Sequence, residues 1–358
     1  MNHVAGGVER MLSTLMNELV ARGHDVSLLT WDQDVTAPFY TLAPEIRWHK
    51  LSIGDAAVKA GFKTRWQRAM KVRKIVKAEK PDVILTFQNG AFLSLWVYTL
   101  GMNVPVIVSE RNAPTMFDHT KAGKYKFLWL QVYGLAPHVI IQTQSQKLMY
   151  PKWVQKKIDV ISNPVFPVPD TPAKQTDSLH KILLSVGRLD YQKNQIVLIK
   201  AFQQIMGRAP DWTLRLVGNG KDRAKLEAYV AEHGMQDRVE FTGDITDVLS
   251  SYRAADLFCL PSRWEGFPNA LAEALSCGLP SVGFAECAGV NDLIEPGTNG
   301  LLAAGMDNPD NLAEPLLTLM NDPSRREKMS IAAKTITQTY TPKAIFDQWE
   351  DVLRRAAR

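Results

Sequence analysis

The sequence has few cysteines and no long hydrophobic run, and both absences restrict the class of protein. Its three cysteines among 358 residues, Cys259, Cys277 and Cys287, lie among apolar or small residues. Their odd number and spacing suggest neither disulfides nor a zinc site, so we expect a reducing cytoplasm. No stretch reaches the roughly 18 apolar residues of a membrane span, and the first residues lack the layout of a signal peptide. We therefore expect a soluble or peripheral protein.

Positive charge is concentrated in the first half of the chain. Residues 1–165 hold 21 Lys and Arg against 12 Asp and Glu, a net charge of +9, whereas residues 166–358 hold 21 against 25, a net charge of −4. Most of the excess lies in 59–80. No known nucleic-acid-binding motif accompanies this segment, so we expect no nucleic acid partner.

The segment 59–80 is predicted to form a basic amphipathic helix. Phe62, Trp66 and Met70 recur at helical spacing. Such a helix either rests on an anionic membrane surface or packs its apolar stripe on the rest of the protein. The basic residues around the stripe are Lys63, Arg65, Arg68, Lys71, Arg73 and Lys74.

Short apolar segments alternate with helical patterns along the whole chain. This rhythm predicts an α/β fold with parallel sheets, arranged as two Rossmann-like domains that face each other across a cleft. The expected strands of the first half are 24–31, 81–87, 104–110, 137–143 and 158–162. Those of the second half are 181–189, 212–220, 238–244, 255–262 and 279–284.

A proline-rich segment without periodicity separates the two halves. We expect an N-terminal domain over 1–165, a linker over 166–179, a C-terminal domain over 180–340 and a final helix over 341–358. A Rossmann-like domain opens with a strand, but here a glycine loop comes first. We expect either that the true start lies upstream or that the N-terminal sheet lacks its first strand.

Two loops carry residues suited to anions. Gly6 and Gly7 precede a predicted helix, where backbone amides can approach an anion, although a tight turn without a ligand would also explain them. Arg188 and Lys193 follow the first strand of the second half, and two cations at a strand end suit a diphosphate. The loop Gly243–Thr246 could frame a nucleotide base, whereas the G-x-G of 217–227 needs no ligand.

The segment 260–282 is the most informative. Glu265 precedes a predicted helix and Glu273 lies inside it, so the two carboxylates occupy different depths of one pocket. Carboxylates suit vicinal hydroxyls, and one could hold a sugar while the other holds a ribose. The alternative is a glutamate stabilised by the helix dipole and a second, exposed one. The helix-start amides expected to face the ligand belong to Gly266, Phe267, Asn269 and Ala270.

The stretch EGFPNALAE, with SCGLPSV behind it, resembles the E-x(7)-E signature of retaining glycosyltransferase family 4, which has the GT-B fold. GGVER, ARGHDVSLLT, SVGRLDYQKN, NPV and EPGTNGLL also resemble family positions. The resemblance covers nearly the whole chain. It implies a glycosyltransferase of bacterial surface-polysaccharide pathways, with an N-terminal domain that binds the acceptor and a C-terminal domain that binds the nucleotide sugar.

The resemblance also implies roles for single residues. Glu265 would bind donor-sugar hydroxyls, Glu273 the ribose, and Arg188 and Lys193 the diphosphate. Since the two cations do the electrostatic work that other transferases assign to a metal, we expect no metal and no cofactor. Gly7 would approach the donor phosphate from the opposite domain, and the final helix would cross back onto the N-terminal domain.

The acceptor side is less clear. Many relatives have a histidine where this chain has Arg111, which either binds an acidic acceptor such as a lipid diphosphate or is a structural cation. With the basic helix, in which Arg65, Trp66, Arg68 and Lys71 would contact acceptor or membrane, we expect a cytoplasmic enzyme on the inner face of the membrane and a lipid-linked glycan acceptor. The alternatives are a soluble transferase or nucleotide-sugar epimerase of the same fold, and a non-catalytic nucleotide-sugar-binding partner.

Overall fold

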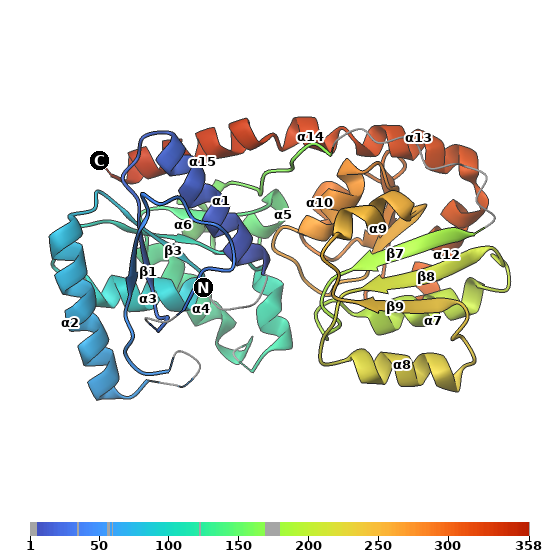
Figure 1. Ribbon diagram of the computed structural model, residues 1–358, viewed down its shortest axis with the longest axis horizontal. Coiled ribbons are helices and arrows are strands. Elements are labelled where there is room, and N and C mark those ends of the chain that lie inside the picture. The colour runs from blue at the N-terminus through green and yellow to red at the C-terminus, as the bar shows by residue number, and fades with distance from the viewer. Residues whose placement is uncertain are drawn as a thin grey trace.

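The computed structural model describes residues 6–33, 36–55, 58, 60–121, 123–168 and 180–357. Two halves lie side by side, each with parallel strands and surrounding helices (Figure 1), which confirms the expected α/β architecture. The expected linker, 166–179, lies mostly outside the described residues.

The N-terminal half has a four-stranded parallel sheet in the order β3-β4-β5-β6 and a separate parallel pair, β1-β2. The strands β4 and β5 are short, rich in Val and Ile, and fully buried, as expected for strands covered on both faces. Its elements are α1 (Gly7–Ala21), β1 (Ser27–Thr30), β2 (Arg47–Lys50), α2 (Phe62–Glu79), β3 (Ile84–Phe87), α3 (Asn89–Tyr98), β4 (Val106–Ser109), η1 (Pro114–His119), η2 (Gly123–Tyr125), α4 (Lys126–Val132), η3 (Tyr133–Leu135), β5 (Val139–Ile141), α5 (Gln144–Lys147), α6 (Lys152–Gln155) and β6 (Ile158–Val160).

The C-terminal half has a six-stranded parallel sheet in the order β12-β11-β10-β7-β8-β9. Sequence reasoning identified five of these strands but missed β12, and it also missed β2 in the other half. The elements are β7 (Lys181–Val186), α7 (Gln195–Ile205), β8 (Trp212–Val217), α8 (Arg223–Glu232), β9 (Val239–Gly243), α9 (Val248–Ala254), β10 (Leu257–Leu260), α10 (Asn269–Ser276), β11 (Ser281–Phe284), α11 (Val290–Leu293), β12 (Gly300–Ala303), α12 (Pro309–Asn321), α13 (Pro323–Ala333), α14 (Ile336–Thr339) and α15 (Pro342–Ala356).

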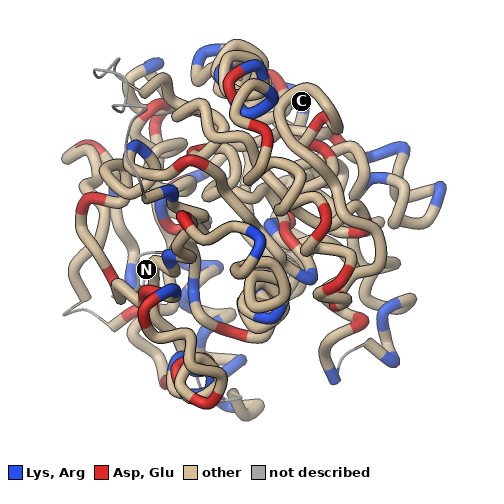
Figure 2. Tube along the Cα trace, turned by 90° about the vertical axis from the view of Figure 1, so that its right-hand side faces the viewer, with Lys and Arg blue, Asp and Glu red and all other residues tan. Residues whose placement is uncertain are grey.

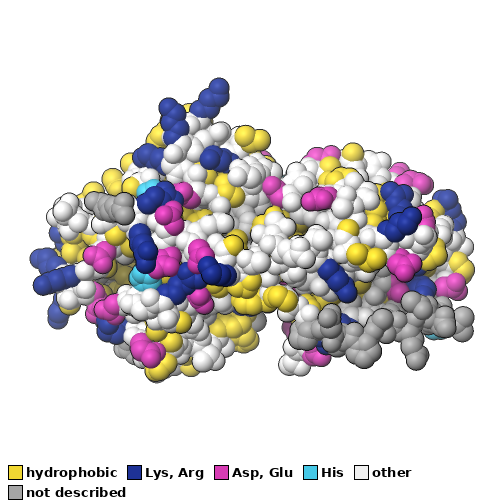
Figure 3. Space-filling model, turned by 90° about the horizontal axis from the view of Figure 1, so that it is seen from above, with side chains coloured by type: hydrophobic (Ala, Val, Ile, Leu, Met, Phe, Trp, Pro, Cys, Tyr) yellow, Lys and Arg dark blue, Asp and Glu magenta, His cyan; other side chains and the backbone are white. Residues whose placement is uncertain are grey.

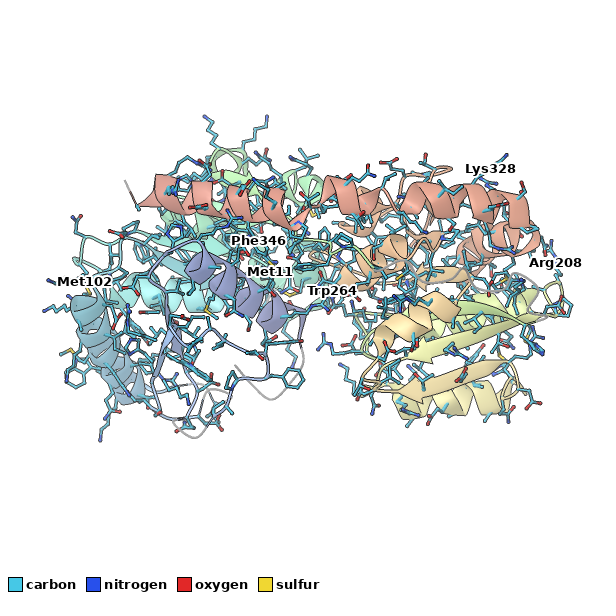
Figure 4. The ribbon with its side chains drawn as sticks, turned by 45° about the horizontal axis from the view of Figure 1, so that its top comes forward. Met11, Met102, Arg208, Trp264, Lys328 and Phe346 are labelled. Carbon is cyan, nitrogen blue, oxygen red and sulfur yellow. The ribbon has the colours of Figure 1, made fainter. Side chains whose placement is uncertain are left out.

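The final helix, α15, lies against the N-terminal half, beside α1 (Figure 1). Its apolar face includes Phe346 and Trp349, which join a buried cluster with Met11 of α1 (Figure 4). Trp349 also stacks on Phe87 of β3, with ring centroids 6.2 Å apart. Arg22 adds ion pairs to two carboxylates of α15. The last helix therefore ties the end of the chain to the half in which the chain begins.

The basic helix α2 turns its apolar stripe outward. Phe62, Trp66 and Met70 are 87%, 58% and 51% exposed, so the stripe does not pack on the protein. Two expected membrane contacts are corrected, because Arg68 and Lys71 face inward. Arg68 donates to the Ile53 carbonyl and lies over the Trp31 ring, and Lys71 donates to the carbonyls of Lys50 and Leu51.

The charge asymmetry of the sequence is visible on the surface. On the C-terminal half, acidic and basic residues are interspersed (Figure 2), whereas basic side chains gather at the outer edge of the N-terminal half, at the side where α2 lies (Figure 3). Figure 3 also shows a waist where the halves meet. Among the described residues, no helix is both long and apolar enough to cross a membrane.

Candidate functional site

The site is built at the point where the strand order of the C-terminal sheet reverses. From β7 the chain adds β8 and β9 on one side, and then returns to place β10 on the other side of β7. The loops that follow β7 and β10 therefore enter helices on opposite sides of one crevice, where open α/β sheets bind ligands. These loops carry the predicted residues Arg188, Lys193 and Glu265.

Lys193 and Glu265 meet in that crevice. The Lys193 ammonium lies 2.6 Å from Glu265 Oε1, and the Ser262 hydroxyl donates to the same oxygen at 2.6 Å. Glu265 is only 5% exposed. A buried carboxylate requires a partner, because its desolvation is costly. Glu265 is predicted to bind the sugar and Lys193 the diphosphate. These are adjacent parts of a nucleotide sugar, and the structure places the two residues in contact.

Arg188 lies on the same loop as Lys193, after β7, but it takes no part in the contact with Glu265 that the structure shows for Lys193. Its guanidinium is exposed and lies 3.5 Å from the Asp190 carboxylate. Gly187, with φ of 151°, lets the loop turn directly after β7, so that Lys193 can fold back beneath it. The two cations share the loop but have different partners, Asp190 for Arg188 and Glu265 for Lys193.

The start of α10 is held by the N-terminal half. Gln146 donates to the carbonyls of Glu265 and Gly266, at 3.3 and 2.6 Å. A Cβ on Gly266 would collide with the Arg111 carbonyl oxygen and the Gln142 amide, so only glycine allows this approach. Further contacts join the halves nearby, since Ser145 donates to Asp292 and His119 stacks on Trp264 at 4.8 Å. The structure therefore shows the halves in direct contact around the crevice (Figure 4).

The expectation for Phe267 concerns its backbone amide, which stays a prediction, and not its side chain. Phe267 is buried in the core of the C-terminal half and packs edge-on against Tyr340, with centroids 5.5 Å apart. Asn269 and Ala270, the first residues of α10, are partly buried instead. Pro268 is the N-cap residue of α10, which begins at Asn269.

Glu273 lies one turn into α10 and is bound from two sides. Arg10 of α1 donates to Oε1 at 2.6 Å, and Tyr252 donates to Oε2 at 3.0 Å. The first contact is an ion pair between the halves, with side chains 49% and 36% exposed. Partly exposed pairs contribute about 0.2–1 kcal/mol. Burial, followed by the charge of Glu273, raises the pKa of Tyr252, so this phenol remains a donor.

A cavity of about 500 Å³ opens beside this pair. Gly7, Arg10 and Thr14 of α1 line one wall, and Asn269 and Glu273 of α10 line the opposite wall. Further lining residues are Thr246, Val248, Leu249 and Tyr252, so the edge of the loop expected to frame a base does reach the cavity. The dimensions are those of a small-molecule site.

Gly7 and Gly6 have different surroundings. A Cβ on Gly7 would lie 2.9 Å from the Asn269 amide nitrogen, so the first turn of α1 meets the first turn of α10 across the cavity. Gly6 is the extended N-cap residue, and the Glu9 carboxylate lies against it. Gly7 therefore permits close approach of the two halves, whereas Gly6 contacts only its own helix.

Of the two alternatives for Arg111, its contacts favour a structural cation. It is buried, donates to Asn163 and lies over the Phe87 ring at 5.5 Å. Burial lowers the pKa of Arg111 to about 9, although the neighbouring Glu110 opposes this. Burial raises the pKa of Glu110, which accepts from Tyr133 and from two backbone amides. Asn163 in turn donates to Asn269 at 2.7 Å, so Arg111 supports the wall of the cavity from behind.

Sequence reasoning gave no role to Arg10 and Asn163, which lie in GGVER and NPV, and missed Gln146 and Tyr252. Arg10 had a usable signal, because it lies three residues after Gly7 and therefore on the same face of α1. The others are recognised only once the halves are assembled. The G-x-G of 217–227 is structural, since Gly218 and Gly220 press on the backbone of the loop after β7. No cluster of three or more metal-ligating residues occurs in the described part of the chain.

Comparison with known proteins assigns both halves to sugar-transferring families. Residues 5–167 match the family Glycosyltransferase Family 4, and residues 170–336 match Glycosyl transferases group 1. A Campylobacter jejuni N-acetyl-D-galactosaminyltransferase, whose name specifies a diphospho-undecaprenol-linked glycan, is 26% identical over 96% of this chain and 94% of its own. The amylovoran biosynthesis glycosyltransferase AmsD of Erwinia amylovora is 25% identical over 98% of this chain and 96% of its own.

A solved structure agrees in fold. HepE of Anabaena, in a complex with UDP and glucose, superposes with a TM-score of 0.79 at 20% identity, over 99% of this chain and 97% of that one. The likeness covers both halves together, so it extends to the way the two sheets face each other.

Proposed function

Since the chain belongs to the GT-B glycosyltransferases, we propose that it moves a hexose or N-acetylhexosamine from a nucleotide diphosphate sugar to a lipid-linked glycan in bacterial polysaccharide biosynthesis. The observation that carries the proposal is the contact between Lys193 and Glu265 at the switch point of the C-terminal sheet. Glu273 lies farther along α10, beside the cavity. One extended ligand could contact all three.

The donor would lie along α10. Its ribose hydroxyls would bind the Glu273 carboxylate, and its diphosphate would lie at the first turn of α10, where Asn269 faces Gly7. Its sugar hydroxyls would bind Glu265, while Lys193 and Arg188 supply positive charge. The structures of relatives support this class of donor, because the HepE complex contains UDP and glucose.

We assign a retaining reaction to this arrangement. The acceptor hydroxyl attacks the anomeric carbon on the face from which the nucleotide diphosphate leaves. The bond from that carbon to the phosphate oxygen breaks, and the departing phosphate accepts the hydroxyl proton. Lys193, already beside the sugar site, stabilises the negative charge that develops on the leaving group. The protein itself supplies position and charge, and needs no nucleophile.

The proposed acceptor is lipid-linked because α2 offers a surface that suits a membrane. Its exposed Phe62, Trp66 and Met70 lie among Lys63 and Arg65, the composition of helices that rest in anionic headgroups. The Campylobacter relative that acts on an undecaprenol-linked glycan supports the same class of acceptor. We propose that the enzyme binds the inner face of the membrane, where a lipid-linked acceptor and a cytoplasmic nucleotide sugar are both accessible.

The test is an assay of sugar transfer with separate arms for donor and acceptor. A panel of UDP-, GDP-, ADP- and dTDP-sugars is offered with a polyprenyl-diphosphate-linked glycan or with the same glycan lacking its lipid. We expect one donor class to be consumed with the lipid-linked acceptor, and the new linkage to keep the donor's anomeric configuration by NMR. Transfer only to the soluble glycan would contradict the acceptor assignment. Donor binding without transfer to either would indicate a non-catalytic binding protein.

A further inference from the structure

Arg10 occupies the carboxylate that the donor ribose would need. In this structure, both oxygens of Glu273 already have partners, Arg10 on Oε1 and Tyr252 on Oε2. A ribose diol needs at least one of these oxygens. Tyr252 is fully buried within the C-terminal core and belongs to the same half as Glu273. Arg10 is half-exposed and comes from the opposite half, so Arg10 is the partner that can be replaced.

The geometry places a released Arg10 beside the diphosphate. Gly7 and Arg10 are one turn apart on α1, and Asn269 and Glu273 are one turn apart on α10. Gly7 faces Asn269 and Arg10 faces Glu273, so the first two turns of both helices lie opposite each other across the cavity. A ribose at Glu273 and a diphosphate at Asn269 would therefore both face the first turn of α1, which runs from Gly7 to Arg10.

We propose that Arg10 is a donor-binding residue that changes partner: it pairs with Glu273 as in this structure, and with the diphosphate when the donor is bound. The guanidinium suits this exchange, because its planar fork of donors fits phosphate as well as carboxylate. A partly exposed ion pair is weak enough to be replaced. Because Arg10 belongs to the N-terminal half and Glu273 to the C-terminal half, the exchange couples donor binding to contact between the halves. This inference rests on the proposed function of the site.

The test separates phosphate binding from nucleoside binding. Isothermal titration of the wild type with UDP, GDP, ADP and dTDP, and with the matching nucleosides, first identifies the preferred base. The same pair is then titrated into Arg10→Met. We expect the nucleoside diphosphate to bind at least tenfold more weakly, because a charged contact is lost. The nucleoside should bind as before or up to about fivefold more tightly, because its competitor at Glu273 is gone.

Two further variants sharpen the test. Arg10→Lys keeps the charge without the fork and should recover part of the diphosphate affinity. Arg208→Met, which removes an exposed arginine of a weak ion pair in the C-terminal half, should leave both affinities unchanged. Circular dichroism confirms folding of each variant.

If Arg10→Met changed the affinities for the nucleoside diphosphate and the nucleoside by the same factor, the inference would be overturned, since a purely structural arginine would act on both ligands alike. Tighter binding of both would also overturn it, because Arg10 would then only close the empty site. A wild type that binds no nucleoside diphosphate would instead contradict the proposed function, whatever Arg10 does.

Discussion

Gly266 shows how a single hydrogen atom decides the contact between the halves. Its position lies directly before the helix that carries Glu273, against the Arg111 carbonyl and the Gln142 amide of the N-terminal half. Any larger side chain must push these groups away. Well-packed interfaces tolerate added methyl groups poorly.

We predict that Gly266→Ala separates the halves at the crevice. The substitution should destabilise the protein by about 1–3 kcal/mol and lower sugar transfer at least tenfold, because Glu265 and the facing loops shift apart. Thermal unfolding and initial rates measure the two effects. Gly207→Ala is the matched control, since a Cβ there meets nothing within 4 Å. Equal behaviour of the two variants would show that the contact has no role.

For single residues, the sequence predicts which side chains belong to a binding motif better than it predicts which side chains are buried. The motif around Glu265 and Glu273 could be recognised because its spacing within one loop and helix is enough to define it. The ion pair of Lys193 with Glu265 could not, because it depends on β7 and β10 being neighbours. The burial of Phe267 and Arg111 could not be predicted for the same reason, because it is decided by Tyr340, Asn163 and other groups distant in sequence.

Among the elements, α2 has the most distinctive surface. One face packs through Val72 and Val76 into the N-terminal core, whereas the opposite face exposes Phe62 and Trp66. Burying such side chains in a bilayer interface contributes about 1.5–3 kcal/mol each, and the basic residues around them add attraction to anionic lipid.

We predict that the double variant Phe62→Ser/Trp66→Ser loses at least tenfold in its affinity for anionic vesicles. Co-sedimentation with vesicles containing about one third phosphatidylglycerol measures the binding, and high salt should weaken the wild type as well. The control Ile331→Ser removes a similarly exposed apolar residue from the C-terminal half. Unchanged binding by the double variant, or an equal loss in the control, would contradict the role of α2.

Short apolar runs made most strands predictable, and the two strands that were missed have physical causes. The strand β2, with sequence Arg47-Trp48-His49-Lys50, carries charges that no propensity rule assigns to a strand. It forms because it pairs with β1, and because Asp25 and Glu79 neutralise Arg47. The strand β12 begins with Gly300, a residue depleted in strands, which allows close approach to β11.

For the whole molecule, the site belongs to neither half alone. The C-terminal half supplies Lys193, Glu265 and Glu273, while the N-terminal half supplies Gly7 and Arg10 and supports the start of α10. The helix α15 returns to the N-terminal half and forms a second connection between the halves. Sequence alone could indicate two Rossmann-like domains, but their mutual contacts involve side chains whose sequence separation exceeds one hundred residues.

We infer that this shared crevice transfers a sugar from a nucleotide diphosphate, and that Glu265 binds the sugar. Initial rates of transfer from the preferred donor are compared for the wild type and Glu265→Gln. Because the substitution leaves Lys193 without its carboxylate, the assay is run well below the melting temperature of the variant. Glu314→Gln, an exposed glutamate of the C-terminal half, is the control.

We predict that Glu265→Gln, folded by circular dichroism, loses at least about a hundredfold in transfer rate while Glu314→Gln keeps the wild-type rate. A rate for folded Glu265→Gln within twofold of the wild type would show that Glu265 does not bind the transferred sugar.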